Sequence, residues 1–439
     1  MLSLLMSMFF LIPLILKINI YVLLIFFFFL TTYFIMMFSW NNFFVYISMN
    51  MGLDYYSFFM VILTFWLFIL MIYGLLNLKN LYFSYLSGLV VLMVIFLVLC
   101  FLTLDFFTFY IYFECSVLPV FLLIYGWGYQ PERVFSSLYF FIYTLMSSLP
   151  LFLLILKLNV FLGYFYFGID YTSNNFFVFF FFIFSFLVKL PMFFFHLWLP
   201  SAHVEAPTSG SMILAGVMLK LGGYGLVRVF YMFTNLISMY SYIFVSLSLL
   251  GSLYVSLFCL LQSDLSVLVA YSSVSHMGLV ICGLMTLTMY GFVGSLYLMV
   301  SHGLVSSGLF YLVGCMYDRL GTRSIFLMRG LINIFPSFMM FFFFLIISNM
   351  SCPPSLNLVS EIFICFSLLS WGNLTLLLII FSLFFSACAM INFFSFICHG
   401  MFSGLLMTLD SGLISEFYLG SLHLIPVYMF ILNLNFFFM

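Results

Sequence analysis

Four ionisable residues of the sequence lie inside apolar stretches, where charged side chains are rare. Glu114 comes nine residues after Asp105, which places it roughly 13 Å along a helix that rises about 1.5 Å per residue. Lys189 ends an apolar stretch that begins at residue 176, and Lys220 lies deep inside a later one. Glu361 follows a pair of prolines by seven residues. Two acids and two lysines at membrane depth have the composition of an alternating acid–base proton relay.

Charge burial restricts how these four residues can be arranged. An isolated ion at the centre of a bilayer costs about 2.5–3.5 kcal/mol on insertion scales, so four would oppose folding by roughly 10–14 kcal/mol. The four side chains must therefore be paired or hydrated, and we expect them to face a bundle interior or a water-filled cavity. The alternative is a set of static buried salt bridges without a transport role.

Residues that disturb helices lie close to these charges. Pro191, two residues after Lys189, lacks a backbone N–H, and Gly222, two residues after Lys220, permits local unwinding. The pair Pro353-Pro354 precedes the second acid. Because broken helices at mid-membrane depth can line a cavity and stabilise ions, we predict discontinuous helices at these three places. A simple packing kink is the alternative at each proline.

Histidine is the other residue type suited to carrying protons, because neutral imidazole both donates and accepts a proton near physiological pH. His302 lies inside the apolar stretch 289–316. His196 follows Lys189 by seven residues and would share its helix face if Pro191 leaves the helix straight. We predict His196 and His302 as auxiliary relay residues, the alternative being interior histidines with satisfied hydrogen bonds. Four others lie nearer the expected membrane edges: His203, His276, His399 and His423.

The sequence gives no sign of cofactor chemistry within the chain. No two histidines have the spacing of a bis-histidine haem pair, the nine cysteines form no C-x-x-C pair, and no glycine-rich nucleotide loop is present. The net charge of −1 gives no support for nucleic-acid binding. We therefore predict no metal and no cofactor bound by this chain, and membrane neighbours as its partners.

The composition indicates that most of the chain is surrounded by lipid. The residues described above must therefore be positioned by membrane-spanning helices. The 439 residues are 67% hydrophobic and 5% charged, with a mean hydropathy of +1.35. Apolar runs able to cross about 30 Å of hydrocarbon follow one another and are too long for the strands of a membrane barrel. The sequence predicts an all-α polytopic membrane protein of about fourteen transmembrane helices. The expected spans are 2–16, 18–38, 54–76, 82–104, 106–126, 135–157, 176–199, 207–230, 240–261, 265–287, 289–316, the interrupted segment 333–371, 373–397 and 417–437.

Most other charges have simpler explanations. Asp54, Asp105 and Asp264 each precede an apolar run immediately, as helix N-caps do. The remaining acids fall in short polar connections, where they would be solvated.

Several strings in the sequence are specific enough to identify a family. They are densest in the block 188–225 and extend over most of the chain from Glu114 onward. The strings are Phe113-Glu114-Cys115, Gly126-Trp127-Gly128-Tyr129-Gln130-Pro131-Glu132-Arg133, Val188-Lys189-Leu190-Pro191, His196-Leu197-Trp198-Leu199-Pro200, Ala202-His203-Val204-Glu205-Ala206-Pro207, Leu219-Lys220-Leu221-Gly222-Gly223-Tyr224-Gly225, Ser272-Ser273-Val274-Ser275-His276-Met277-Gly278, Ser301-His302-Gly303-Leu304 and Pro353-Pro354-Ser355-Leu356-Asn357-Leu358. With them the chain resembles subunit 4 of mitochondrial NADH dehydrogenase, respiratory complex I.

This resemblance implies an antiporter-like fold and a proton-translocating core subunit of the complex I membrane arm, in the mitochondrial inner membrane. It implies that Glu114 and Lys189 form a pair, that Lys220 is the central relay residue and that Glu361 is the terminal acid. It further implies a subunit of an NADH:ubiquinone reductase whose NADH, FMN, iron–sulfur clusters and ubiquinone bind to partner subunits. Neighbouring antiporter-like subunits and lipid would contact this chain.

The same resemblance suggests how the chain is organised. We expect one transmembrane domain over 1–439, with N-terminal helices in 1–104. A first antiporter-like helix bundle is expected in 105–261, and a second bundle with the C-terminal helices in 262–439.

One string departs from the family pattern. The family reads Gln-Thr-Asp-x-Lys where this chain has Gln262-Ser263-Asp264-Leu265-Ser266, so a basic side chain is missing at Ser266. Two other functions remain open from the sequence. A stand-alone cation/proton antiporter would share the broken helices and the Glu–Lys pair, and a non-transporting scaffold would hold the buried charges as fixed pairs.

Overall fold

The computed structural model describes residues 5–10, 20–37, 44–48, 50–75, 83–162, 166–167, 175–401 and 412–437. Within these ranges, ten helices are long and apolar enough to cross a membrane, and four shorter apolar helices accompany them. The prediction of a polytopic all-α membrane protein is confirmed. The first expected span, 2–16, lies mostly outside the described residues.

The chain divides into two compact units. The first comprises residues 1–189 and 205–239, and the second comprises 190–204 and 240–438. The elements of the first unit are α2 (Ile20–Met36), the antiparallel pair β1 (Val45–Ser48) and β2 (Met51–Leu53), α3 (Tyr55–Leu75), α4 (Phe83–Leu102), α5 (Phe106–Cys115), α6 (Val117–Trp127), α7 (Arg133–Leu162), α8 (Phe176–Lys189), α10 (Thr208–Ile213), a π-helical turn (Leu214–Met218) and α11 (Leu219–Phe230).

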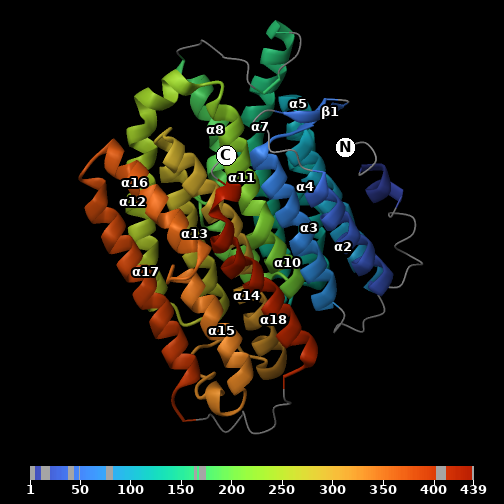
Figure 1. The fold of residues 1–439 in the computed structure, drawn as a ribbon, viewed down its shortest axis with the longest axis vertical. Coiled ribbons are helices and arrows are strands. Elements are labelled where there is room, and N and C mark those ends of the chain that lie inside the picture. Colours follow the sequence, from blue (N-terminus) through green and yellow to red (C-terminus); the bar gives the residue numbers. More distant parts are fainter. Residues whose placement is uncertain are drawn as a thin grey trace. The chain divides into compact units, whose positions relative to one another are not determined.

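The second unit contains most of α9 and α12 together with all later helices. In Figure 1, α13, α14 and α16 of this unit run side by side, in agreement with their packing contacts. Its elements are α9 (Trp198–Glu205), α12 (Thr234–Leu261), α13 (Leu265–Met285), α14 (Met289–Leu320), a short 3-10 helix (Leu331–Asn333), α15 (Pro336–Asn349), α16 (Leu356–Trp371), α17 (Thr375–Cys398), α18 (Ile414–Met429) and a second 3-10 helix (Phe430–Phe437).

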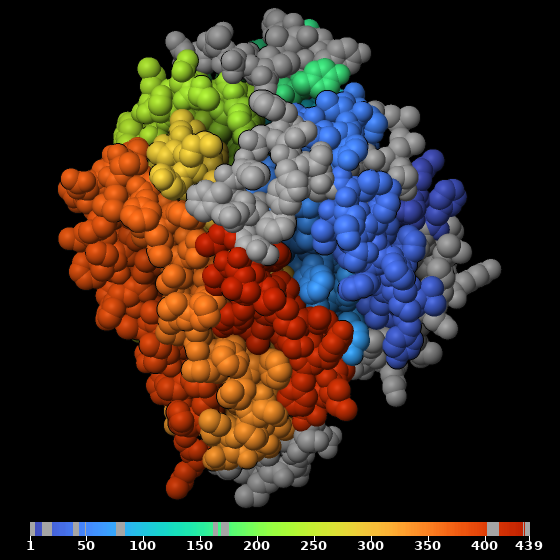
Figure 2. Space-filling view, in the orientation of Figure 1, coloured from blue at the N-terminus to red at the C-terminus, as the bar shows by residue number. Residues whose placement is uncertain are grey.

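The outer helices show why the sequence is so rich in phenylalanine. The face of α17, orange in Figure 2, carries exposed apolar side chains that include Leu377, Ile380, Phe381 and Phe384. A surface of this kind is stable when hydrocarbon or an apolar neighbouring subunit covers it, and against hydrocarbon any apolar side chain suffices. By contrast, α11 is buried on every side.

Two of the three predicted helix breaks are confirmed. Helix α8 ends at Lys189, and the chain is not helical again until Trp198, beyond Pro191. A second break, at 350–355, contains Pro353-Pro354 and separates α15 from α16. In both places the missing proline N–H interrupts the helical hydrogen-bond ladder.

The predicted break at Gly222 is wrong. Helix α11 runs without interruption from Leu219 to Phe230, and the irregularity is the π-helical turn that precedes Lys220. The glycine sequence serves close packing instead, because a Cβ atom at Gly225 would lie 2.2 Å from Cε1 of Phe186 on α8.

Of the three predicted N-caps, one makes a capping hydrogen bond and two do not. Asp54 does cap α3, since its Oδ1 accepts a hydrogen bond from the Ser57 N–H at 2.9 Å. Asp105 and Asp264 occupy the N-cap positions of α5 and α13 without a side-chain capping bond. The Asp105 carboxylate accepts from Asn50 Nδ2 at 2.9 Å instead. Partial burial raises the pKa of Asp105, and the Asn50 hydrogen bond opposes this effect.

We predict that Gly225→Ala destabilises the chain, because the new methyl group would force the buried ring of Phe186 out of its packed position. The expected loss is about 1–3 kcal/mol of unfolding free energy, as for other overpacked interiors. Thermal unfolding of the detergent-solubilised protein measures it. Gly88→Ala in α4 is the matched control, since a Cβ there meets nothing within 4 Å. Equal melting temperatures for the two variants would contradict the close approach of α8 and α11.

Candidate functional site

Glu114 and Lys189 meet inside the first unit. Lys189 is the last residue of α8, is 3% exposed, and has its Nζ 4.0 Å from Oε1 of Glu114 near the end of α5. The same ammonium donates a hydrogen bond to the backbone oxygen of Phe113 at 3.1 Å and lies 2.9 Å from the centre of the Phe113 ring. At 4.0 Å the two charges interact electrostatically rather than through a short hydrogen bond. A change of charge on either residue is therefore felt directly by the other.

Lys220 is also in the first unit and is fully buried. Its ammonium donates a hydrogen bond to the carbonyl of Ala215, which belongs to the π-helical turn. A π turn shifts the backbone hydrogen-bond register by one residue, so its carbonyls point toward groups five residues later in the chain, as that of Ala215 does toward Lys220. The irregularity near Lys220 therefore supplies an acceptor for the buried charge.

Glu361 lies in the second unit, on α16, and is 7% exposed. Its Oε1 accepts a hydrogen bond from Ser351 Oγ at 2.5 Å and lies 3.3 Å from Nδ1 of His276 on α13. The ring of His276 is 5.4 Å from the ring of the fully buried His302 on α14. The carboxylate thus begins a row of proton-exchanging groups contributed by three helices.

Two members of this row were not predicted from the sequence. The sequence favours a position for His276 near a membrane edge, whereas α13 begins at Leu265 and ends at Met285, so the histidine is close to its middle. Ser351 lies in the break between α15 and α16 with φ 58°, the left-handed region that a residue with a side chain occupies at a cost of about 1–3 kcal/mol. In this conformation the serine hydroxyl reaches the carboxylate of Glu361.

The expectation that His196 shares a helix face with Lys189 is wrong. Helix α8 ends at Lys189, so the helical spacing does not continue through Pro191. His196 is 7% exposed, and its ring stacks on that of Phe193 at 5.6 Å between centroids. The ring of Tyr271 lies 6.2 Å away.

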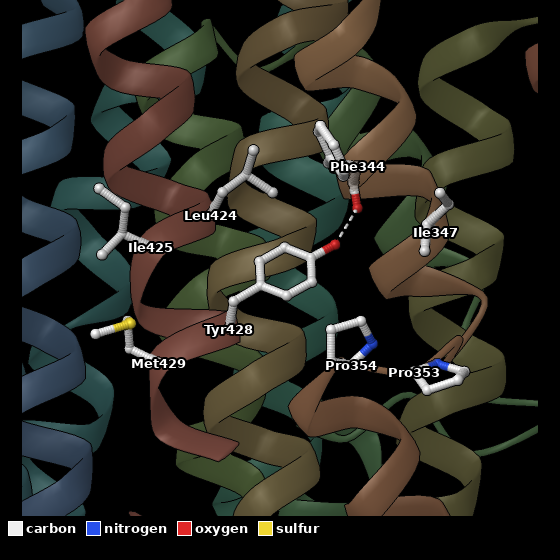
Figure 3. Close-up of a pocket in the computed structure, with 8 residues that line it drawn as sticks. All are labelled: Phe344, Ile347, Pro353, Pro354, Leu424, Ile425, Tyr428 and Met429. Carbon is white, nitrogen blue, oxygen red and sulfur yellow. Dashed lines mark hydrogen bonds between the residues drawn. The ribbon is translucent and has the colours of Figure 1, made fainter. Parts of the chain in front are cut away.

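A cavity of about 520 Å³ lies beside the break between α15 and α16 (Figure 3). Its one side-chain hydroxyl, Tyr428 Oη, donates a hydrogen bond to the Phe344 carbonyl at 3.2 Å. No acid, lysine or histidine lines it, so the cavity is almost wholly apolar. The lining residues are Phe344, Ile347, Pro353, Pro354, Leu424, Ile425, Tyr428 and Met429.

The described ranges contain no group of three or more histidine, cysteine, aspartate or glutamate side chains able to hold a metal ion. The nine cysteines are all free thiols.

Buried acid and lysine side chains beside helix breaks, in an all-helical membrane chain, define an antiporter-like protein. Residues 103–386 match the family described as NADH:quinone oxidoreductase/Mrp antiporter, TM. A chain of the respiratory complex I from Thermus thermophilus with bound NADH superposes with a TM-score of 0.88 at 21% identity, over 99% of this chain and 96% of that one. A chain of the Mrp complex from Dietzia sp. DQ12-45-1b gives a TM-score of 0.82 at 18% identity, over 91% and 79% of the two chains. The fold is therefore the one shared by these assemblies.

Sequence similarity narrows this class to one family. Residues 1–104 match the family described as NADH-ubiquinone oxidoreductase chain 4, amino terminus. The NADH-ubiquinone oxidoreductase chain 4 of Ceratitis capitata is 45% identical over 407 residues, which cover 89% of each chain. The chain belongs to the NADH-ubiquinone oxidoreductase chain 4 family.

We predict that Ser351→Ala shifts the vibrational band of the Glu361 carboxyl group, because it removes the hydroxyl that donates to Oε1. Infrared difference spectroscopy measures the band, which Glu361→Gln identifies by removing it. Ser360→Ala is the matched control, since that neighbouring hydroxyl donates to the Asn357 carbonyl instead. An identical spectrum for Ser351→Ala and the unmodified protein would show that Ser351 does not hold the carboxylate.

Proposed function

We propose that this chain is the proton-translocating, antiporter-like subunit of the membrane arm of respiratory complex I in the mitochondrial inner membrane. The observation that carries the proposal is the buried Glu114–Lys189 pair together with the fully buried Lys220 in the same unit. Family membership supports it, because the relatives are named as chains of an NADH-ubiquinone oxidoreductase. In this role the chain works within an NADH:ubiquinone reductase that translocates protons.

The division of labour follows from the residues present. Electron transfer requires NADH, FMN, iron–sulfur clusters and ubiquinone, and we assign these to partner subunits. This chain would contribute the titratable groups Glu114, Lys189, Lys220 and Glu361, with His196 and His302 as auxiliary relay residues. The proximity of His276 to Glu361 adds a seventh residue to this proposed relay.

The proposed coupling is electrostatic. Quinone reduction elsewhere in the complex changes the charge and hydration around the Glu114–Lys189 pair. That change alters how firmly Lys220, in the same unit, holds its proton, because charges interact strongly over short distances in a medium of low dielectric constant. Moving one charge against 100 mV requires about 2.3 kcal/mol, which electrostatic changes in such a confined site can supply.

We predict that Lys220→Met and Glu114→Gln each lower proton translocation per NADH oxidised while leaving assembly of the complex intact. Lys220→Met removes the proton-carrying group, and Glu114→Gln removes the charge 4.0 Å from Lys189. Proton uptake into vesicles with the reconstituted complex, measured together with NADH oxidation, gives the ratio. Lys157→Met is the matched control, because Lys157 is an exposed lysine on α7.

Two outcomes would replace the proposal with another function. Unchanged proton translocation in fully assembled Lys220→Met and Glu114→Gln complexes would leave the chain a non-transporting scaffold. If the chain purified alone exchanges cations for protons without redox partners, it is a stand-alone antiporter.

A further inference from the structure

A second buried ion pair lies in the first unit, apart from the proposed relay. Arg228 on α11 is 1% exposed, and Asp54 at the start of α3 is 9% exposed. The guanidinium donates two hydrogen bonds to this carboxylate, Nη1 to Oδ2 at 2.5 Å and Nη2 to Oδ1 at 2.7 Å. Such a bidentate pair fixes distance and orientation together. Because Asp54 also caps α3 through Ser57, the pair ties α11 to the first turn of that helix.

Tyr224 extends the pair to a third helix. Arg228 Nη2 donates to Tyr224 Oη at 2.7 Å, and this hydroxyl donates to the backbone oxygen of Phe101 on α4 at 2.8 Å. The cluster of Asp54, Tyr224 and Arg228 therefore connects α3, α4 and α11. These hydrogen bonds involve charged groups and a backbone atom. Helix α11 therefore cannot slide along α3 and α4 by a fraction of a helical turn without breaking several of them at once.

The surroundings of the guanidinium exclude a relay function for it. It lies over the rings of Tyr224, Phe44 and Phe167, at 4.5, 5.1 and 5.3 Å from their centres. Arginine does not give up its proton in proteins. Burial acts to raise the pKa of Asp54, but the Arg228 guanidinium and Ser57 outweigh burial and lower it, so the carboxylate stays charged. Two permanent charges in an aromatic cage hold a position and do not transfer protons.

The spacing along α11 connects this cluster to the proposed relay. Lys220, Tyr224 and Arg228 follow one another at intervals of four residues, which places them on one side of the helix. At about 1.5 Å per residue, Arg228 is roughly 12 Å along the axis from Lys220. Helix α3 packs against α11, and it also packs against α10 and the π-helical turn. The depth and rotation at which Arg228 is held therefore determine where Lys220 and its turn lie against α3.

The glycines of α11 explain why the helix requires such a fixed point. Between Lys220 and Arg228 the helix contains Gly222 and Gly223, which add no side chain that could interlock with a neighbour, and Gly225, which receives the Phe186 ring of α8. Smooth apolar surfaces resist sliding weakly, whereas a bidentate ion pair resists it strongly.

We infer that Asp54, Tyr224 and Arg228 are positioning residues that set the depth and rotation of α11 and thereby hold Lys220 in its working place. This inference rests on the proposed function of Lys220. It assigns to the start of α3 and the end of α11 a part in proton translocation in which no proton is exchanged.

The test uses Arg228→Lys and Tyr224→Phe in the assembled complex, each alone and combined with Lys220→Met. Arg228→Lys keeps the charge but loses the bidentate geometry, and Tyr224→Phe removes a single hydroxyl in case the first variant fails to assemble. Arg319→Lys is the matched control, because Arg319 pairs with Glu416 between α14 and α18 of the second unit. Proton translocation, NADH oxidation and the amount of assembled complex are measured for each.

We expect Arg228→Lys to reduce the part of proton translocation that depends on Lys220 by about twofold to thirtyfold, the range for residues that modulate the coupling between sites. NADH oxidation with the membrane uncoupled should stay unchanged. In the Lys220→Met background, Arg228→Lys and Tyr224→Phe should cause no further loss, because the group they position is absent. Arg319→Lys should leave translocation unchanged.

Three results would overturn the inference. Normal translocation by assembled Arg228→Lys and Tyr224→Phe complexes would show that Lys220 does not depend on the cluster. Equal losses with and without Lys220 would assign the cluster to general stability. If Lys220→Met alone had no effect, the proposed function would fail and the positioning role with it, an outcome recognisable from the single variant.

Discussion

The structure depends on one constraint, that a charge in a medium without water must find its compensation in the protein itself. Each deeply buried charge meets this requirement differently. Arg228 and Asp54 form a rigid bidentate pair, whereas Lys189 and Glu114 stand 4.0 Å apart and exchange no short hydrogen bond. Tight compensation fixes a charge in place, and looser compensation leaves it responsive. The two kinds of pair occur in the same unit, one rigid and one able to respond to a change of charge nearby.

Irregular helix segments provide part of the compensation for these buried charges. A regular helix uses its own N–H and C=O groups and has none to offer a buried ion. Lys189 ends α8 and reaches the Phe113 carbonyl, Lys220 uses a carbonyl of the π-helical turn, and Glu361 receives the Ser351 hydroxyl from the break before α16. The interruptions are therefore part of the same chemistry as the charges.

The sequence predicted what depends on hydrophobicity and local backbone chemistry. Apolar length gave the helical membrane architecture, the depth of Glu114 and Lys189 marked them as unusual, and proline marked both confirmed breaks. What it missed depends on tertiary contact. The glycines of α11 have the same signature whether a helix unwinds or packs closely, and only the neighbouring Phe186 decides between the two. Likewise, the sequence explains Asp54 as a helix N-cap, and its pairing with Arg228 across 174 residues has no local signal.

The contrast between the outer face of α17 and the interior of α11 has a consequence for how such a gene can change. On the outer face, exchanges among phenylalanine, leucine, isoleucine and methionine leave the lipid contact intact, so substitutions there accumulate freely and follow whatever bias mutation imposes. At Gly225, a single added methyl group collides with a neighbouring ring. Descendants of one ancestral sequence would therefore diverge from the outside inward, and overall identity between lineages would understate how much of the interior they have kept in common.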